Sequence, residues 1–162
     1  MRISSILENQ LIEKRIAITP EIAKKYLSLG FDVELSENYG VHLGIKDKEY
    51  LEIGVIITGD EKKILNNADV IVQLNLPSDD KSSLIKENQT LIGALNPFKN
   101  EEKIKGLIKK KVNVLSLELL PRITRAQSMD ILSSQANLAG YKAVLESFAN
   151  FEKAIPMMMT AA

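Results

Sequence analysis

The sequence predicts an α/β domain: a Rossmann-like or flavodoxin-like parallel sheet with helices on both faces, followed by a long C-terminal helix. Short β-branched apolar runs alternate with longer amphipathic segments over residues 2–117, and such an alternation of strands and helices favours a parallel sheet. A helical pattern then extends over about residues 124–151, which is unusually long for a chain of 162 residues.

The first half of the sequence supplies three expected strands and two expected helices. Thr19 is a suitable helix cap, Pro20 suits the first helical position, and Gly30 is typical of a helix end. Apolar and polar residues alternate from Phe31 to Leu35, as in a half-buried strand. The expected strands are residues 2–7, 31–35 and 55–57, and the expected helices are residues 19–30 and 46–53.

The second half shows the same alternation more clearly. Ile104, Leu107 and Ile108 share one face of its last short helix, which indicates packing on a sheet. Thr124 and Gln127 have the spacing of a capping box, so the long helix is expected to begin there. The expected helices are residues 60–67, 77–86 and 100–111, and the expected strands are residues 69–74, 90–95 and 112–117.

Composition and charge exclude several classes of function. Lys+Arg and Asp+Glu both number 21, so no basic field favours nucleic acid or an anionic membrane. Cysteine is absent and His42 is the only histidine, so we expect no metal site. No apolar run approaches the ~20 residues that a membrane-spanning helix needs, and residues 1–8 become charged too early for a signal peptide. We therefore expect a cytosolic chain that reaches a membrane only through a partner.

The glycine-rich turn that binds a dinucleotide is missing. Glycines occur in the first half of the chain, but no G-x-G-x-x-G follows any expected strand. Without such a turn the backbone cannot approach a pyrophosphate closely. The domain alone is therefore not expected to bind NAD strongly.

The long helical pattern carries an uncharged, amide-rich polar stripe. Its members are spaced by three or four residues, so a continuous helix would place them on one face. They are Gln127, Asp130, Ser134, Asn137 and Tyr141, with Ser133 at the border. Such a stripe suits hydrogen bonding to a neutral polar ligand, and it equally suits packing against a second domain with its polar groups satisfied.

Two arginines beside apolar stretches are further candidates. Arg15 precedes an apolar stretch and Arg122 follows one. A guanidinium in such a place can hold a carboxylate or phosphate with two hydrogen bonds. An ion pair with Glu13 or Glu118 is the alternative, and the sequence leaves both open.

Three motifs resemble those of the alanine dehydrogenase/transhydrogenase family. Residues 13–20, Glu-Lys-Arg-Ile-Ala-Ile-Thr-Pro, resemble the opening motif of both enzymes. Residues 121–130 and 132–141 look like the transhydrogenase signature almost residue for residue, and residues 156–162 resemble the crossing into the NAD-binding domain. The resemblance covers the whole chain and favours the N-terminal domain of the alpha subunit of a proton-translocating NAD(P) transhydrogenase.

That resemblance implies a site and a chemistry. Transhydrogenases move a hydride from NADH to NADP and couple this step to proton translocation by a membrane component. By resemblance, Arg122, Gln127 and Asp130 form a loop beside the nicotinamide, Gln127 orients the ring, and Ser133 contacts its carboxamide region. None of them acts as an acid or base, since hydride transfer requires none, and their contribution is alignment of the two rings.

The resemblance also implies cofactors and partners. NAD(H) would bind through a second domain, and NADP(H) would bind on a partner subunit. The partners would be an NADP-binding subunit and a membrane subunit, with a homodimer of the full alpha subunit and no nucleic acid. Localisation would be on the cytoplasmic side, peripheral to the inner membrane.

Alanine dehydrogenase is the rival within the same family. That enzyme uses a lysine and a histidine to bind and activate pyruvate, and the corresponding positions here are Asn75 and Asn96. An amide cannot serve as a general acid as lysine or histidine can. Arg15, which would hold the substrate carboxylate, is present but insufficient alone.

The resemblance predicts two segments of the chain. Residues 1–133 would be the α/β N-terminal domain, and residues 134–162 a linking helix with the truncated start of the crossover to a missing NAD-binding domain. The glycine-rich turn expected after Ala162 lies outside the sequence, so this chain alone is expected to be inactive. A non-catalytic docking fragment is the further alternative.

Overall fold

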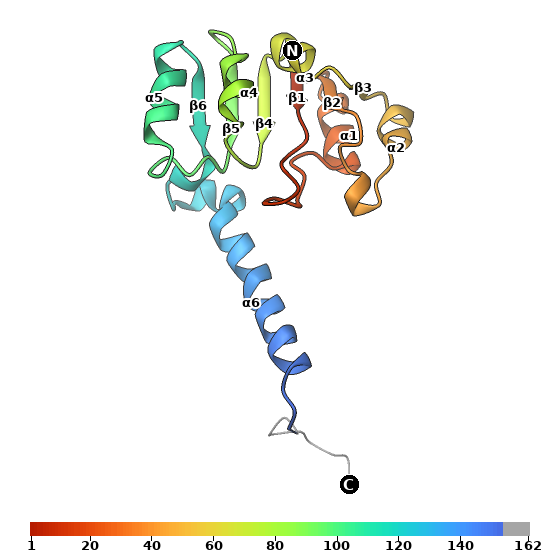
Figure 1. Ribbon diagram of the computed structural model, residues 1–162, viewed down its shortest axis with the longest axis vertical. Helices are drawn as coiled ribbons and strands as arrows, with labels where there is room; N and C mark the ends of the chain where they lie inside the picture. The colour runs from red at the N-terminus through yellow and green to blue at the C-terminus, as the bar shows by residue number, and fades with distance from the viewer. Residues whose placement is uncertain (154–162) are drawn as a thin grey trace. The chain divides into compact units, whose positions relative to one another are not determined.

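A computed structural model describes residues 1–153 of the chain (Figure 1). The chain divides into two compact units, Met1–Leu119 and Leu120–Ala162. The expected segment from Pro156 to Ala162 lies outside the described residues.

The first unit is built on a six-stranded sheet in which every strand pair is parallel, in the order β3-β2-β1-β4-β5-β6 (Figure 1). This confirms the predicted parallel sheet and gives it the strand order of a Rossmann fold. The strands are β1 (Arg2–Ser5), β2 (Asp32–Ser36), β3 (Ile56–Thr58), β4 (Val70–Gln73), β5 (Thr90–Gly93) and β6 (Asn113–Ser116).

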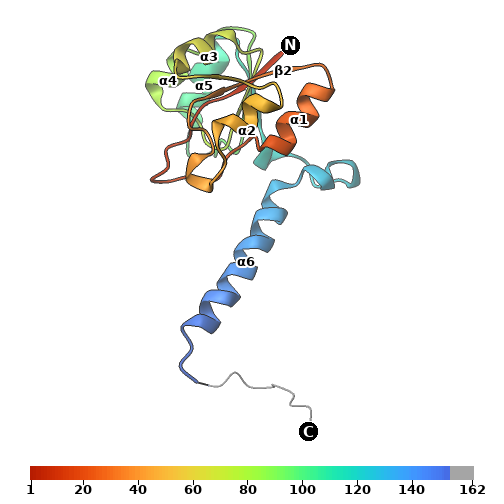
Figure 2. The same ribbon diagram turned by 90° about the vertical axis from the view of Figure 1, so that its right-hand side faces the viewer.

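Helices connect these strands and cover both faces of the sheet. Figure 2 shows α1 and α2 on one side and α3, α4 and α5 on the other. The predicted cap of α1 is confirmed, because Thr19 accepts from the Ile22 N–H and Pro20 opens the helix. The helices of this unit are α1 (Pro20–Ser28), α2 (Asp47–Glu52), α3 (Glu61–Asn67), α4 (Asp79–Ser83) and α5 (Glu101–Lys109), with 3-10 turns at Val41–Leu43 and Leu117–Leu119.

The alternation of side chains along β4 divides the core into two clusters. Ile71 belongs to the cluster under α3 and α5, whereas Val70 and Val72 pack against the cluster under α1 and α2. Successive side chains of a strand point to opposite faces, so a strand covered on both faces needs apolar residues at every position. The continuous β-branched run in β4 satisfies that need.

The strand order places a switch point between β1 and β4, where the connections leave in opposite directions. Ligands of open α/β sheets bind outside the carboxyl ends of the strands at such a point. Here a buried polar network occupies the position beneath it. Ser5 donates to Gln73 Oε1 at 2.8 Å, and Gln73 Oε1 also accepts from the Ile6 N–H at 2.9 Å.

Tyr39 joins this network to the segment before α1. Ser5 has one hydroxyl proton and gives it to Gln73, so the Tyr39 hydroxyl donates to Ser5 Oγ at 2.7 Å. Tyr39 then accepts from the N–H groups of Ala17 and Ile18, at 3.1 and 3.3 Å. Burial raises the pKa of Tyr39 to about 12, so the hydroxyl keeps the proton that it donates.

Replacing Tyr39 with phenylalanine should lower the free energy of unfolding by about 2 kcal/mol, because two backbone N–H groups and Ser5 lose a buried partner. Urea unfolding would measure the loss. Tyr26→Phe is the matched control, since the Tyr26 ring packs against the same cluster and its hydroxyl makes no hydrogen bond within residues 1–153. Equal effects of the two substitutions would contradict the role given to the network.

The second unit begins with a loop and a 3-10 helix rather than with the long helix that the sequence predicts. The 3-10 helix spans Thr124–Met129, and α6 spans Ile131–Ala149. The predicted helix start at Thr124 was therefore wrong, and Thr124 makes no capping box with Gln127. Asp130 is the actual cap, and its carboxylate accepts from the Ser133 N–H at 3.0 Å. Aspartate at this position ends one segment and starts the next.

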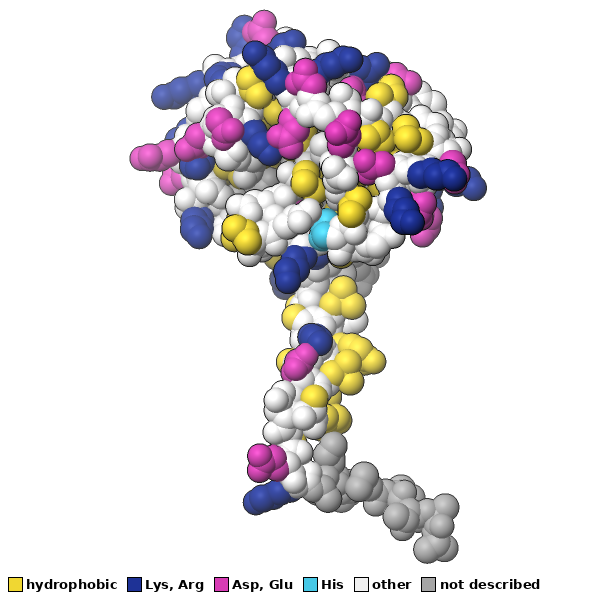
Figure 3. All heavy atoms as spheres, turned by 45° about the vertical axis from the view of Figure 1, so that its right-hand side comes forward, with side chains coloured by type: hydrophobic (Ala, Val, Ile, Leu, Met, Phe, Trp, Pro, Cys, Tyr) yellow, Lys and Arg dark blue, Asp and Glu magenta, His cyan; other side chains and the backbone are white. Residues whose placement is uncertain are grey.

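The residues of α6 are exposed apart from the half-buried Ile131. Large apolar side chains along it include Leu138, Tyr141, Leu145 and Phe148, and Figure 3 shows apolar groups following the helix. The helix has too little polar surface for one meant to stand in water on every side. Within residues 1–153, no helix is both long and apolar enough to cross a membrane.

Candidate functional site

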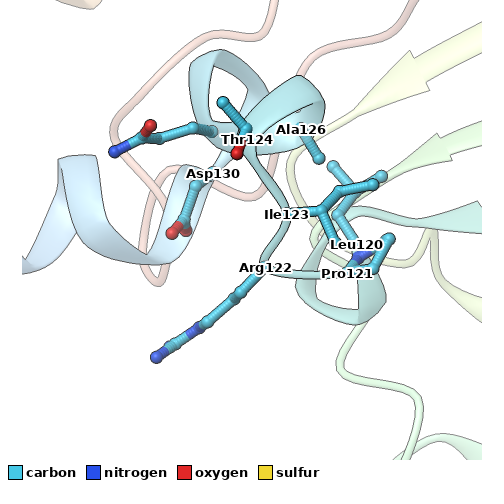
Figure 4. Close-up of a pocket in the computed structure, with 8 residues that line it drawn as sticks. Leu120, Pro121, Arg122, Ile123, Thr124, Ala126 and Asp130 are labelled. Carbon is cyan, nitrogen blue, oxygen red and sulfur yellow. The ribbon is translucent and has the colours of Figure 1, made fainter.

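The loop that precedes α6 forms a pocket of about 370 Å³. All of its lining residues come from the second unit. Figure 4 shows its apolar side chains gathered on one side of the loop, with Arg122 and Asp130 extending from the other. The lining residues are Leu120, Pro121, Arg122, Ile123, Thr124, Ala126, Gln127 and Asp130.

Asp130 has the best-defined surroundings in this pocket. Its Oδ1 accepts from the Ser133 N–H at 3.0 Å, and its Oδ2 accepts from the Ser133 hydroxyl at 2.7 Å. The hydroxyl and the N–H of Ser133 hold the pKa of Asp130 below its ordinary value, and the positive charge of Arg122 lowers it further. At neutral pH the pocket therefore presents an ionised carboxylate, which can only accept hydrogen bonds.

Arg122 and Gln127 complete the polar side of the pocket. Both are exposed. The guanidinium of Arg122 makes no ion pair within 4.0 Å in residues 1–153, and Glu118, the partner considered for it, instead accepts from Ser116 Oγ and from the N–H groups of Leu95 and Asn96. Arg122 can therefore donate to a ligand, and the Gln127 amide can both donate and accept.

The structure brings together the three predicted catalytic residues Arg122, Gln127 and Asp130, and it places Ser133 outside the pocket lining. It does so through the turn before α6 and not through a shared helix face. Only Ser134, Asn137 and Tyr141 of the predicted stripe lie within α6. The pocket offers a cation, an acceptor and an amide beside apolar side chains, which suits a flat ligand carrying a neutral group that both donates and accepts hydrogen bonds.

The carboxyl edge of the sheet holds two further cavities, of about 470 and 240 Å³. Asn75 lines both, and Asn96 lines the smaller. Carboxylates already occupy the neighbouring backbone donors. Glu8 Oε1 accepts from the Leu74 N–H at 2.7 Å, and its Oε2 accepts from the Asn75 side chain at 3.3 Å. This edge therefore presents negative charge where an anionic substrate would need donors.

Sequence reasoning missed Glu8 and Glu118. Each carboxylate comes from the end of one strand and binds the backbone beyond the end of the next strand in the sheet. The partners are far apart in the chain, 66 residues for Glu8 and Leu74. No local pattern could have identified them, because the contact depends on which strands are neighbours.

Arg15 is held by Glu13. Its Nε donates to Glu13 Oε1 at 2.9 Å and its Nη2 donates to Oε2 at 2.6 Å. The hydrogen bond from Arg15 holds the pKa of Glu13 below its ordinary value, and the pKa of Arg15 is raised in turn by Glu13. Of the two alternatives left open by the sequence, the structure shows the ion pair with Glu13.

The first crossover of the sheet has no glycine. Residues 6–19 connect β1 to α1, the place where a Rossmann domain carries its phosphate-binding turn, and none of them is glycine. The strand order is that of a dinucleotide-binding fold, but the element that approaches a pyrophosphate is absent from this connection.

Comparison with known proteins gives the same picture. Residues 6–139 match the family described as alanine dehydrogenase/PNT, N-terminal domain. The chain is 40% identical to the first portion of NAD(P) transhydrogenase subunit alpha of Rickettsia prowazekii (strain Madrid E), over 100% of this chain and 43% of that protein. A crystal structure of transhydrogenase from Sinorhizobium meliloti superposes with a TM-score of 0.89 at 40% identity, covering 99% of this chain and 48% of that one.

An alanine dehydrogenase is a more distant relative. The enzyme of Halomonas elongata is 26% identical over 95% of this chain and 41% of its own length. The chain thus spans less than half the length of each of these relatives. The match over residues 6–139, together with the whole-chain similarity, shows that the chain belongs to the family of alanine dehydrogenase and PNT N-terminal domains.

Proposed function

We propose that this chain is the N-terminal portion of the alpha subunit of a proton-translocating NAD(P) transhydrogenase, with the loop pocket at the hydride-transfer site. The observation that carries the proposal is the convergence of Arg122, Gln127 and Asp130 on one pocket. Identity of 40% over the whole chain to a transhydrogenase alpha sequence supports it.

The polar groups of the pocket fit the carboxamide of a nicotinamide ring. The ionised Asp130 can accept from the amide nitrogen, and Arg122 can donate to the amide oxygen. Gln127 can do either, and the apolar lining offers a surface for the ring. Ser133 is outside the lining and its hydroxyl is bound to Asp130, so the proposal keeps Gln127 as the residue that orients the ring.

The bound nucleotides supply the hydride chemistry, and this chain's residues supply alignment. A carboxylate, a guanidinium and an amide in set positions restrict how the ring can rotate, and such restriction can account for large parts of a reaction barrier. None of the three needs to exchange a proton during the transfer.

The rest of the enzyme lies in other segments and chains. We propose that NAD(H) binds mainly through a second domain, because residues 6–19 have no glycine-rich turn, and that NADP(H) binds on a partner subunit. Residues 1–133 would be the N-terminal domain and residues 134–162 the linking helix and crossover. The complete subunit would form a homodimer on the cytoplasmic side of the inner membrane, attached through a membrane subunit.

Alanine dehydrogenase is the second candidate, because a relative of that name covers 95% of the chain. The carboxyl edge argues against it. Arg15 is paired with Glu13, and Asn75 binds the carboxylate of Glu8. A 2-oxo acid would meet negative charge there and no general acid at Asn75 or Asn96.

The test is an activity assay on the complete alpha subunit combined with its NADP-binding and membrane components. Hydride transfer from NADH to NADP, without turnover of pyruvate, ammonium and NADH, is the expected result. The opposite pattern would establish alanine dehydrogenase. Absence of both activities from a folded, fully assembled preparation would favour a docking fragment and overturn the proposal.

A further inference from the structure

Ser133 donates both of its hydrogen bonds to a single carboxylate. Its N–H donates to Asp130 Oδ1 at 3.0 Å, and its hydroxyl donates to Oδ2 at 2.7 Å. A serine has one backbone and one hydroxyl proton, so neither is left for a ligand. The two bonds reach different oxygens, and together they prevent the carboxylate from rotating.

Asp130, in contrast, lines the pocket and Ser133 does not. Each carboxylate oxygen accepts one bond from Ser133 and has further acceptor capacity. The same carboxylate also caps α6. The start of the helix and the acceptor in the pocket are therefore one group.

From this geometry we propose that Ser133 is a positioning residue, which acts on the nicotinamide site through Asp130 and does not contact the ligand. The proposal rests on the proposed function of the loop pocket and goes beyond it, since resemblance alone implies a direct contact between Ser133 and the carboxamide region. Ser133 sets the direction of the Asp130 carboxylate and favours its ionised form, because both of its donors stabilise the negative charge.

A double-mutant cycle in the complete, assembled enzyme separates the two roles. The variants are Ser133→Ala, Asp130→Asn and their combination, with NADH affinity and the rate of hydride transfer measured for each. Asparagine also caps helices well, so Asp130→Asn preserves the start of α6. Ser133→Thr keeps both donors and serves as the conservative variant.

We expect Ser133→Ala to weaken NADH binding or slow transfer by about 3- to 10-fold, the range of one hydrogen bond to a charged group. Ser133→Thr should stay within about twofold of wild type, since its hydroxyl can replace that bond. In the Asp130→Asn background Ser133→Ala should have almost no further effect, because the group that it positions is gone.

Two other outcomes have distinct meanings. If Ser133→Ala causes the same loss with and without Asp130→Asn, Ser133 acts on the ligand independently, and this inference is overturned while the proposed function stands. If Asp130→Asn changes neither binding nor transfer in a folded enzyme, the loop pocket is not the nicotinamide site, and both proposals fall.

Discussion

Replacing Gly93 with alanine is expected to lower the free energy of unfolding by about 3 kcal/mol, at the upper end of overpacking effects. A Cβ at this position would lie 2.1 Å from the Gln73 carbonyl oxygen and 3.0 Å from Leu95 Cδ2. Gly93 pairs with Gln73 in β4 and with Ser116 in β6, so it is held between two strands. The backbone oxygen cannot move aside without loss of the β4–β5 pairing.

The effect should extend beyond the strand pair. Gln73 anchors the buried network through Ser5 and reaches Glu8 through its side-chain nitrogen at 3.2 Å. A shift of β4 at Gln73 would therefore disturb the carboxyl edge of the sheet as well as the core. Only glycine leaves room for the approach of the two strands at this point.

Gly106→Ala is the matched control for this substitution. Gly106 lies within α5 on an exposed surface, and a Cβ there would meet no atom within 4 Å. Alanine should stabilise the helix by about 0.5–1 kcal/mol. Urea unfolding of wild type and both variants, side by side, would measure the two changes. A loss below about 0.5 kcal/mol for Gly93→Ala would show that β5 can shift at little cost, and the argument from the close approach would be wrong.

Much of the fold could be predicted from the sequence because periodicity reports burial. The β-branched run in β4 and the Thr19-Pro20 start of α1 were both identified and both are confirmed. The strand order was not predicted, because local patterns do not state which strands are neighbours. The contacts of Glu8 and Glu118 were missed for the same reason.

The site shows where periodicity misleads. Gln127 and Asp130 have helical spacing with Ser134 and Asn137, yet a 3-10 helix ends before Asp130 and α6 begins after it. The Asp130 carboxylate competes for the N–H groups that a continuous helix would use, and the helix restarts at that point. Motif resemblance pointed to the residues that converge on the pocket, whereas the structural element that carries them was predicted wrongly.

Gln127→Ala should slow hydride transfer by about 100-fold in the complete enzyme, the cost of a displacement of about 1 Å between reacting groups. Removing the amide leaves Arg122 and Asp130 in the pocket, so the nucleotide still has charged partners. NADH affinity should therefore change by less than about threefold, since most binding would come from the second domain. The substitution removes orientation and leaves most of the binding.

Stopped-flow transhydrogenation beside an equilibrium titration with NADH would measure both quantities on the same preparation. Ser128→Ala is the control, because Ser128 lies in the same 3-10 helix, is exposed and does not line the pocket. An unchanged transfer rate in Gln127→Ala would rule out the orienting role. Equal losses in affinity and rate would instead assign Gln127 to ground-state binding, because an interaction made equally with substrate and transition state changes affinity without a separate effect on the chemical step. A selective loss of rate is the result that only alignment of the ring explains.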